Sequence, residues 1–522
     1  MKSKHRGDFS IDNRLLLLLV AAIPTGILAS FSAVILLYLI NFFTNIFFFH
    51  QFSFAAANPS EATPSLLTFL APCVGGLIIG LMARFGSERI RGHGIPEALE
   101  AILFGKSIMN PRVAVLKPLS SAISLGSGGP FGAEGPIIMT GGALGSICAQ
   151  FFRFSASERK TLLVAGAAAG MSAIFASPIA AVLLAVELLL FEWKPRSLIP
   201  VAVASSVAAA MRHYMLGAGP IIPLAAMPIL PESDVLCAIL VGVVAGGAAA
   251  LLSSSLYKLE DFFHRLPLHW MWWPCIGGLA VGLGGLIEPR ALGIGFDVIT
   301  DFLNGRIGPS HAGIIITVKA LIWVIALASG TSGGVLAPLL MIGAGLGLVE
   351  AQILPGDPAL WAMVSMSAML GGVMGVPFTA MIFAVELTHV TSVLPLLLAA
   401  CIASYTVSVF ITKRSILTEK IARRGFDIFR EYNVDPLERM RVIEVMSKEI
   451  TMHDADPIPS SIHAHASCRK AAEMMARESC SILRVLDDHS HQAIGYVNLV
   501  DLLKARKLHI DEEELREKIL FK

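Results

Sequence analysis

Long apolar runs constrain this chain more than any other feature of its sequence. Residues 15–49 are almost continuously apolar, and similar runs recur as far as residue 412. A segment that crosses a bilayer must be a helix or part of a closed barrel, because its backbone finds no water there. As a helix, residues 15–49 would extend roughly 50 Å against a hydrocarbon core of about 30 Å, so this helix must tilt or protrude. The pattern predicts further helices near residues 65–83, 134–150, 159–173, 178–192, 198–215, 232–262, 269–287, 310–329, 335–353, 358–372, 377–389 and 392–412.

The composition excludes several classes of protein. Of 522 residues, 55% are hydrophobic and 15% are charged, whereas a soluble protein averages about 25% charged residues. A net charge of +1 gives no broad basic signal for nucleic acid. The seven cysteines are scattered without a Cys-x-x-Cys pair, which indicates neither a metal site nor a disulfide framework. We expect an integral membrane protein with no cofactor, no metal and no nucleic-acid partner.

A glycine-rich stretch, residues 126–147, carries a single ionisable side chain, Glu134. The glycines beside Glu134 and the following Pro136 are typical of a loop that becomes a helix, because proline suits the first helical turn. Free amides at the start of a helix make a ready anion site. An acidic side chain at this place can occupy that site itself, as a tethered anion.

The stretch around Glu134 has a second copy later in the chain. Residues 132–145 align without gaps on residues 334–347, and a further matched pair, residues 177–188 and 376–387, follows in the same order. Duplicated halves with helices broken by glycine and proline are typical of transporters whose site lies between the repeats. Packing of small residues between membrane helices also enriches glycine, but it requires neither Glu134 nor the paired helix starts.

Charge marks the limits of the predicted domains. Basic residues dominate an N-terminal arm of residues 1–14, and a second basic group follows residue 412. Because basic segments favour the cytoplasmic side, we expect both termini in the cytoplasm. Beyond residue 433 the chain is soluble in character, with helices predicted at 467–475 and 498–505 and strands at 482–486 and 493–497. The predicted domains are the arm, a membrane domain of residues 15–425 with repeats of about 65–215 and 269–412, and an α/β module of residues 433–522.

Three pentapeptides and the repeated Pro-x8-Glu blocks resemble the CLC family of chloride channels and proton-coupled chloride exchangers, over roughly residues 10–425. The resemblance implies an all-α fold with an inverted repeat of many tilted, broken helices. It also implies a homodimer in the lipid bilayer, with one pathway per subunit for chloride or a similar monovalent anion. The pentapeptides comprise Gly92, His93, Gly94, Ile95 and Pro96, then Gly132, Ala133, Glu134, Gly135 and Pro136, and finally Gly334, Val335, Leu336, Ala337 and Pro338.

The resemblance assigns site roles. Glu134 falls on the external gating glutamate, which occupies an anion site when charged and swings away when protonated. His93 falls where many members have a chloride-coordinating serine, and Leu417 falls where many have a tyrosine hydroxyl. Leu417 cannot donate a hydrogen bond, whereas His93 can donate from either ring nitrogen or can be a helix N-cap that points elsewhere. The implied anion-binding set is His93, Gly94, Ile95, Leu417 and the backbone amides of Val335 and Leu336.

Coupling to protons stays open at this stage. Many exchangers carry a relay glutamate directly after the residue that Glu187 matches, but this chain has Leu188 there. Channels usually lack that acid, and some exchangers also lack it. Glu187 and its repeat partner Glu386 are either members of a proton path or buried structural acids. Lys117 lies inside an apolar run, where it either borders the anion path or snorkels to the surface.

The C-terminal module resembles a single CBS motif that ends in residues 493–502. Family members with such a tail usually carry two paired motifs, and paired motifs can bind adenine nucleotides. Asp501 is therefore a candidate ribose contact, and the alternative is a structural dimerisation cap.

The sequence predicts transport of chloride or a similar monovalent anion, gated by Glu134, in a prokaryotic inner membrane. Proton-coupled exchange is the preferred mechanism, and a passive chloride channel is the alternative. A nucleotide-sensing membrane protein is a remote third reading. We expect no enzyme, because residues 330–334 match Gly-x-Ser-x-Gly only by letter and lack the preceding strand.

Overall fold

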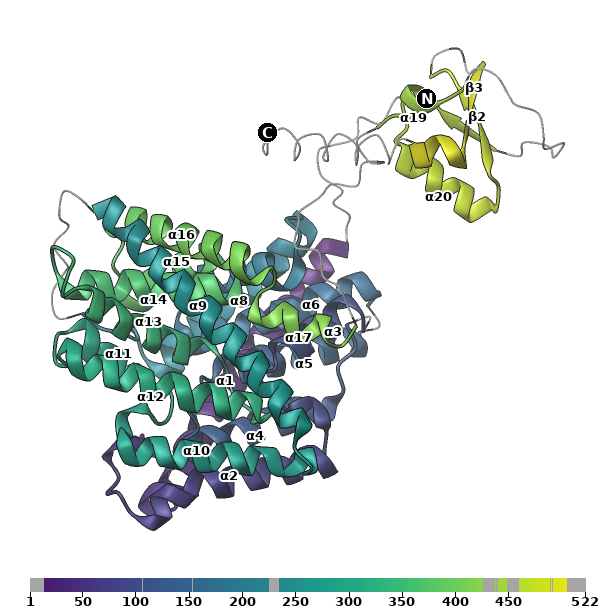
Figure 1. Cartoon of the computed structure of the whole chain (residues 1–522). Coiled ribbons are helices and arrows are strands. Elements are labelled where there is room, and N and C mark those ends of the chain that lie inside the picture. Colours follow the sequence, from purple (N-terminus) through teal and green to yellow (C-terminus); the bar gives the residue numbers. More distant parts are fainter. Residues whose placement is uncertain are drawn as a thin grey trace. The chain divides into compact units, whose positions relative to one another are not determined.

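The chain forms two compact units, Met1–Phe429 and Arg430–Lys522, in the computed structural model (Figure 1). Apart from Arg14, the predicted N-terminal arm lies outside the described residues, as do residues 505–522. The structure describes residues 14–105, 107–152, 154–224, 234–425, 437, 440–447, 460–488, 490 and 492–504.

The first unit is a bundle of helices in two successive series. The first series consists of α1 (Arg14–Thr44), η1 (Asn45–Phe49), η2 (Pro59–Glu61), α2 (Leu66–Phe85), η3 (Glu88–Ile90), α3 (Ile95–Leu103), α4 (Pro111–Gly126), α5 (Glu134–Phe151), α6 (Ala156–Phe175), α7 (Pro178–Leu184), η4 (Ala185–Leu190) and α8 (Pro195–Leu216). The second consists of α9 (Asp234–Arg265), η5 (Trp270–Trp272), α10 (Trp273–Ile287), η6 (Pro289–Ala291), α11 (Phe296–Leu303), α12 (Pro309–Ala328), α13 (Leu336–Glu350), α14 (Pro358–Met374), α15 (Pro377–Thr388), α16 (Leu394–Thr412) and α17 (Ile416–Ala422).

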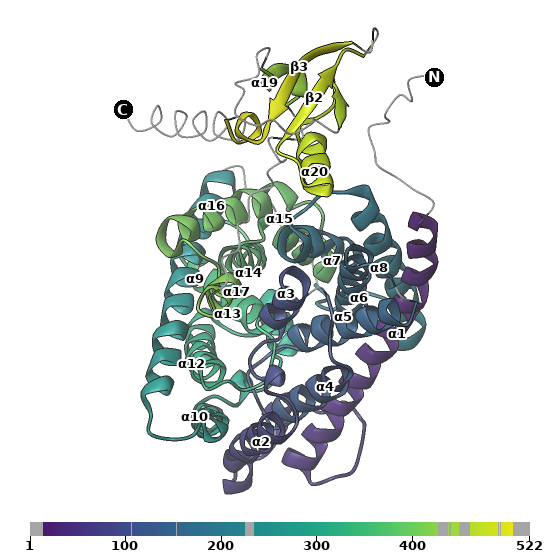
Figure 2. The same cartoon turned by 90° about the vertical axis from the view of Figure 1, so that its right-hand side faces the viewer.

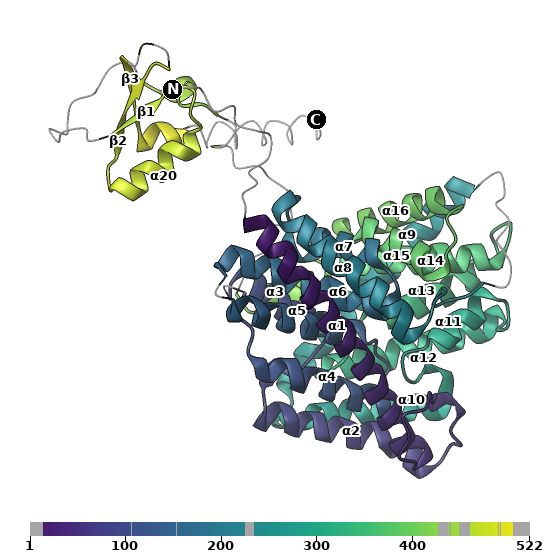
Figure 3. The same cartoon turned by 180° about the vertical axis from the view of Figure 1, so that it is seen from behind.

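The bundle contains both long helices and short ones. In the described part of the chain, six helical segments are long and apolar enough to span a membrane: Arg14–Phe49, Leu66–Phe85, Val235–Arg265, Trp270–Ile287, Pro309–Ala328 and Leu394–Ala422. The first of these, α1, crosses α6 and α8 (Figure 3). Short helices such as α7, α13 and α15 lie among the others, where protein groups rather than lipid surround their ends.

Two helices lie deep in the bundle because they are apolar on every face. Residues 161–175 of α6 and residues 360–374 of α14 are buried throughout. A helix that is apolar all round must be covered on all sides. The neighbours α5 and α13 supply that cover, and Figure 2 shows α5 beside α6 and α13 beside α14.

The two series meet at a close crossing of α2 and α10. A side chain on Gly76 would overlap the backbone of Pro274, and one on Gly278 would overlap the backbone of Pro72. Glycine therefore lets the two helices approach to backbone contact. Cys73 and Cys275, one residue beyond each proline, bring their Sγ atoms to 3.1 Å, so equivalent positions of the two series face each other.

The second unit contains a small sheet. Its elements are α19 (Val442–Val445), β1 (Ser461–His463), α20 (Cys468–Glu478), β2 (Ile482–Leu486) and β3 (Ala493–Asn498). Strand β2 is central, with β1 parallel and β3 antiparallel to it. The predicted helix capped by Ser467 and the two predicted strands are confirmed, whereas the three-residue β1 was not predicted. The likeness to a CBS motif stays a prediction.

Candidate functional site

The two copies of the glycine-rich motif meet in the middle of the first unit. Gly132 donates a backbone hydrogen bond to Gly334 (3.1 Å), and Gly334 donates one back to Gly132 (2.7 Å). This bridge holds the loop before α5 against the loop before α13. The two helix starts therefore share one buried site.

Glu134, the first residue of α5, fills this site with its carboxylate. The side chain is fully buried, and its Oε1 accepts a hydrogen bond from the amide of Ala337 in the first turn of α13 (3.0 Å). Its Oε2 has no partner among the described residues. A side chain at Gly132 or Gly334 would overlap the carboxylate, so glycine makes the room that it occupies. The carboxylate of one repeat is thus the anion bound at the helix start of the other.

The pentapeptide Gly92–Pro96 packs against the two copies of the glycine-rich motif. Gly92 donates a backbone hydrogen bond to Gly330 (3.3 Å), and a side chain on Gly135 would overlap the carbonyl of His93. Gly94, with φ of 86°, is the N-cap of α3, so His93 is not the cap. The His93 side chain is 1% exposed, and neither ring nitrogen has a partner among the described residues. Both nitrogens are available to a bound group.

The remaining anion-binding candidates are buried and apolar. Val335 and Leu336 cap and open α13, so their amides belong to the free N–H groups of a helix start. Leu417 is fully buried in α17 and offers no donor. The hydroxyl of Tyr257 on α9 donates to the carbonyl of Ile416 and anchors α17.

Lys117 binds the backbone. Its ammonium donates to the carbonyls of Ile90 (2.8 Å) and Gly92 (2.7 Å) and to the hydroxyl of Ser332 (3.0 Å), so all three donors are used. Lys319, which sequence reasoning missed, donates in the same way to the carbonyls before α11, at residues 291 and 293 (3.0 and 2.7 Å). Each lysine lies the same distance before its motif glycine, so extending the repeat alignment backwards would have found the second one.

Glu187 and Glu386 cap each other's helices. The Glu187 carboxylate accepts from the amide of Thr379 (2.7 Å) at the start of α15. The Glu386 carboxylate accepts from the amides of Ile179 (3.0 Å) and Ala180 (2.8 Å) at the start of α7. Leu188 beside Glu187 is fully buried. These contacts give both acids a structural task, although they leave the predicted proton path untested.

Asp501 has a local partner in the second unit. Its carboxylate accepts from the amide of Asn498 (3.1 Å), and the Asn498 side chain accepts from the amide of Asp501 (2.8 Å). This reciprocal capping gives Asp501 a local structural contact, while the ribose contact and the dimerisation cap both stay predictions.

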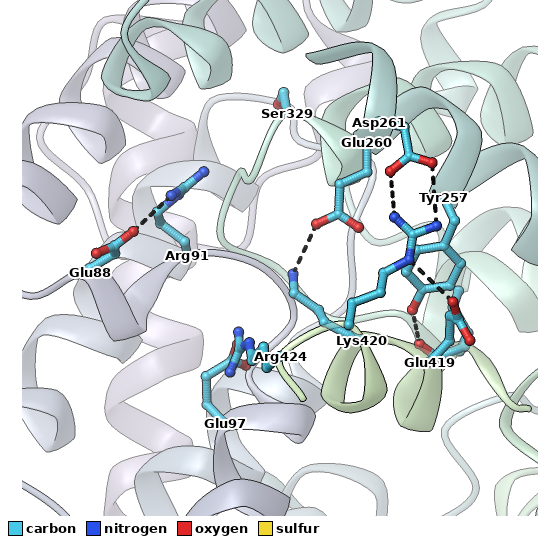
Figure 4. Close-up of polar contacts among 12 residues, drawn as sticks. Glu88, Arg91, Glu97, Tyr257, Glu260, Asp261, Ser329, Glu419, Lys420 and Arg424 are labelled. Carbon is cyan, nitrogen blue, oxygen red and sulfur yellow. Dashed lines mark hydrogen bonds and ion pairs between the residues drawn. The ribbon is translucent and has the colours of Figure 1, made fainter. Parts of the chain in front are cut away.

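A cavity of about 830 Å³ opens between α3, α9 and α17, with Arg91 and Glu97 on either side of the Gly92–Pro96 motif in its lining. Four of its basic side chains are paired with acids: Arg91 with Glu88, Arg424 with Glu97 and Glu100, Lys420 with Glu260, and Arg423 with Asp261. Figure 4 shows the pairs of Arg91 with Glu88 and of Lys420 with Glu260. Sequence reasoning did not predict these pairs, because, apart from Arg91 and Glu88, their members come from segments far apart in the chain. We call this space the vestibule; its lining includes Glu88, Arg89, Arg91, Glu97, Glu100, Glu260, His264, Trp273, Gly330, Lys420, Arg423 and Arg424.

Comparison with known proteins finds a matching family model and several relatives. Residues 74–408 match a family model described as voltage gated chloride channel. A putative chloride channel protein, ClcB-like, of Ralstonia nicotianae is 28% identical over 382 residues, which cover 71% of this chain and 89% of that protein. An H(+)/Cl(-) exchange transporter, ClcA, of Salmonella newport is 26% identical over 372 residues, which cover 68% and 78%.

Solved structures share the fold. A slow cyanobacterial Cl-/H+ antiporter superposes with a TM-score of 0.68 at 24% identity, covering 80% of this chain and 99% of that one. A CLC-type fluoride/proton antiporter superposes with a TM-score of 0.67 at 20% identity, covering 78% and 98%. The predicted membrane fold of many helices is confirmed by this likeness.

Proposed function

This chain belongs to the CLC family of voltage-gated chloride channels, and we propose that it exchanges chloride or a similar monovalent anion for protons, with Glu134 as the gate. The observation that carries this proposal is the hydrogen bond between the Glu134 carboxylate and the amide of Ala337. The two groups belong to different repeats, so the tethered anion occupies the place where a transported anion would pass.

The chemistry of the gate follows from charge. An ionised Glu134 competes with external anions for the amides at the start of α13. When a proton neutralises the carboxyl group, its attraction to those amides falls, and the side chain can give way to an anion. One carboxyl group thus binds either the site or a proton, which is the alternation that exchange requires.

Helix-end amides suit a site that must also release its ligand. They attract an anion through partial charges and avoid the deep trap that a buried cation would make. The ammonium groups of Lys117 and Lys319 donate to backbone carbonyls instead of to an anion at the helix starts. In this arrangement His93 adds a side-chain donor near the path, because its ring nitrogens have no protein partner in the described part of the chain.

Reconstituted vesicles test the proposal directly. We expect an outward chloride gradient to drive proton movement against its own gradient, and Glu134→Gln to abolish the proton movement while anion flux continues. Passive anion flux without proton movement in the parent protein would instead favour the second candidate, a chloride channel. The buried Leu188 in place of a relay acid is the observation that favours that alternative.

The assembly and topology belong to the same proposal. We expect a homodimer in a bacterial inner membrane with both termini in the cytoplasm. The basic residues after α16 support this orientation, because the positive-inside rule assigns such a cluster to the cytoplasmic side. The cluster comprises Lys413, Arg414, Lys420, Arg423 and Arg424.

A further inference from the structure

Lys420 is a cation of the vestibule that lies close to the Gly92–Pro96 motif. It comes from α17, and a side chain placed on Gly92 would lie 2.8 Å from its Nζ. Gly92 directly precedes His93, whose ring nitrogens have no protein partner in the described part of the chain. The ammonium of Lys420 therefore stands where the vestibule ends and the closed part of the path begins.

Two arginines of the vestibule, Arg424 and Arg91, are held by short contacts. Arg424 lies 2.6 Å from Glu97 and 2.7 Å from Glu100, and Arg91 lies 3.0 Å from Glu88. The Arg91 guanidinium also stacks 4.4 Å above the ring of Trp270, a cation–π contact that fixes it further. These cations hold the walls in place and have little freedom to meet an incoming ion.

Lys420 differs from these arginines in the looseness of its pair. Its one ion pair among the described residues is with Glu260, at 3.9 Å, which is too long for a hydrogen bond (Figure 4). Its side chain is 18% exposed. A lysine ammonium is a compact charge on a flexible stem, so it can turn from Glu260 to another anion with little rearrangement.

The Lys420–Glu260 pair is not needed to hold α17 on α9. The hydroxyl of Tyr257 already binds the carbonyl of Ile416, and Arg423 already binds Asp261. A purely structural task for Lys420 would duplicate these contacts. Its position over Gly92 is better explained by a role in the path.

We propose that Lys420 binds the anion as it enters the path from the vestibule, and that Glu260 is its resting counter-ion, which the transported anion displaces. This inference rests on the proposed function and on its orientation, which make the vestibule the cytoplasmic mouth. Glu260 keeps the ammonium from becoming a deep anion trap, because it competes for the same charge. Without Lys420, the unpaired Glu260 would repel anions inside the vestibule.

The test compares four variants in vesicles at low cytoplasmic-side chloride. For Lys420→Met we expect a fall in anion flux of about tenfold, because a cation at the mouth of a cleft raises ion capture by this order or more. The defect should shrink as an impermeant salt screens the charge. Adding Glu260→Gln to Lys420→Met should recover most of the flux, and Glu260→Gln alone should lower the chloride concentration needed for half-maximal flux. Arg89→Gln, which removes another cation of the same vestibule, should change flux far less.

The outcomes separate this inference from the function on which it rests. Absence of anion flux in the parent protein would overturn the proposed function. Normal parental flux with an unchanged Lys420→Met variant, or a double variant no better than the single one, would overturn the role of Lys420. If Lys420→Met fails to give a monodisperse protein, Glu260→Gln alone decides, since an unchanged half-saturating concentration contradicts the competition.

Discussion

A substitution at Gly132 can displace the Glu134 carboxylate from its site without changing Glu134 itself. A Cβ at this position would overlap the carboxylate of Glu134, and the atoms it meets are the far end of a flexible side chain. In Gly132→Ala we therefore expect the carboxylate to leave its site at the start of α13 while the backbone stays in place. The lost contact is a charge-assisted hydrogen bond to Ala337, worth about 1.5–3 kcal/mol. The population of the closed gate should fall about tenfold to hundredfold.

The assay is initial anion flux in vesicles over a series of pH values. In the parent protein, acid should raise flux, because protonation removes the charge that the α13 amides hold. In Gly132→Ala, flux near neutral pH should already be high and should respond little to acid. Gly247→Ala is the matched control, since its Cβ would meet nothing within 4 Å. A folded Gly132→Ala protein with the parental pH response would show that the Glu134 carboxylate does not close the path at the start of α13.

Three further measurements address the gate, the repeat interface and the lysines. Glu134→Gln should pass anions without moving protons, and persistent uphill proton movement in this variant would exclude it as the gate. Mild copper–phenanthroline oxidation should join Cys73 to Cys275, and mass spectrometry that finds only other pairs would contradict the crossing of α2 and α10. Lys117→Met and Lys319→Met should each leave two buried carbonyls unpaired, which costs about 2–6 kcal/mol of folding free energy. The two variants should therefore lower the unfolding temperature by similar amounts. A Lys117→Met protein with parental stability but weakened anion binding would return Lys117 to the anion path.

The parts of the fold that were predictable are those fixed by local rules. Proline in the first turn and glycine before it predict the starts of α5 and α13 within a residue. The repeat pattern predicts that these starts form a pair. The eight-residue α11 (Phe296–Leu303) escaped prediction because it has no proline start and is too short to show a period. Its counterpart α3 does have such a start, with Pro96 in its first turn.

The side-chain partners were not predictable, because they depend on how the repeats are folded against each other. Alignment pairs Glu187 with Glu386, yet nothing in it says that each caps the helix start of the other's repeat. The cost of a charge in an apolar run identifies Lys117 as a residue that needs partners, but it does not name carbonyls as those partners. The vestibule is assembled from α3, α9 and α17, so no single stretch of sequence contains its pattern.

One principle connects the buried charges of this protein. Glu134, Glu187 and Glu386 each bind amides at a helix start, while Lys117 and Lys319 bind carbonyls of loops that precede helices. The carboxylates thus bind amides, and the ammonium groups bind carbonyls, that have no partner within an α-helix. Because helix-end amides keep their donors whatever side chain they carry, Val335 and Leu336 can be apolar without loss of the site. Selection among anions must then come from the few side chains that remain unbound or loosely bound, which directs mutagenesis first to His93 and Lys420.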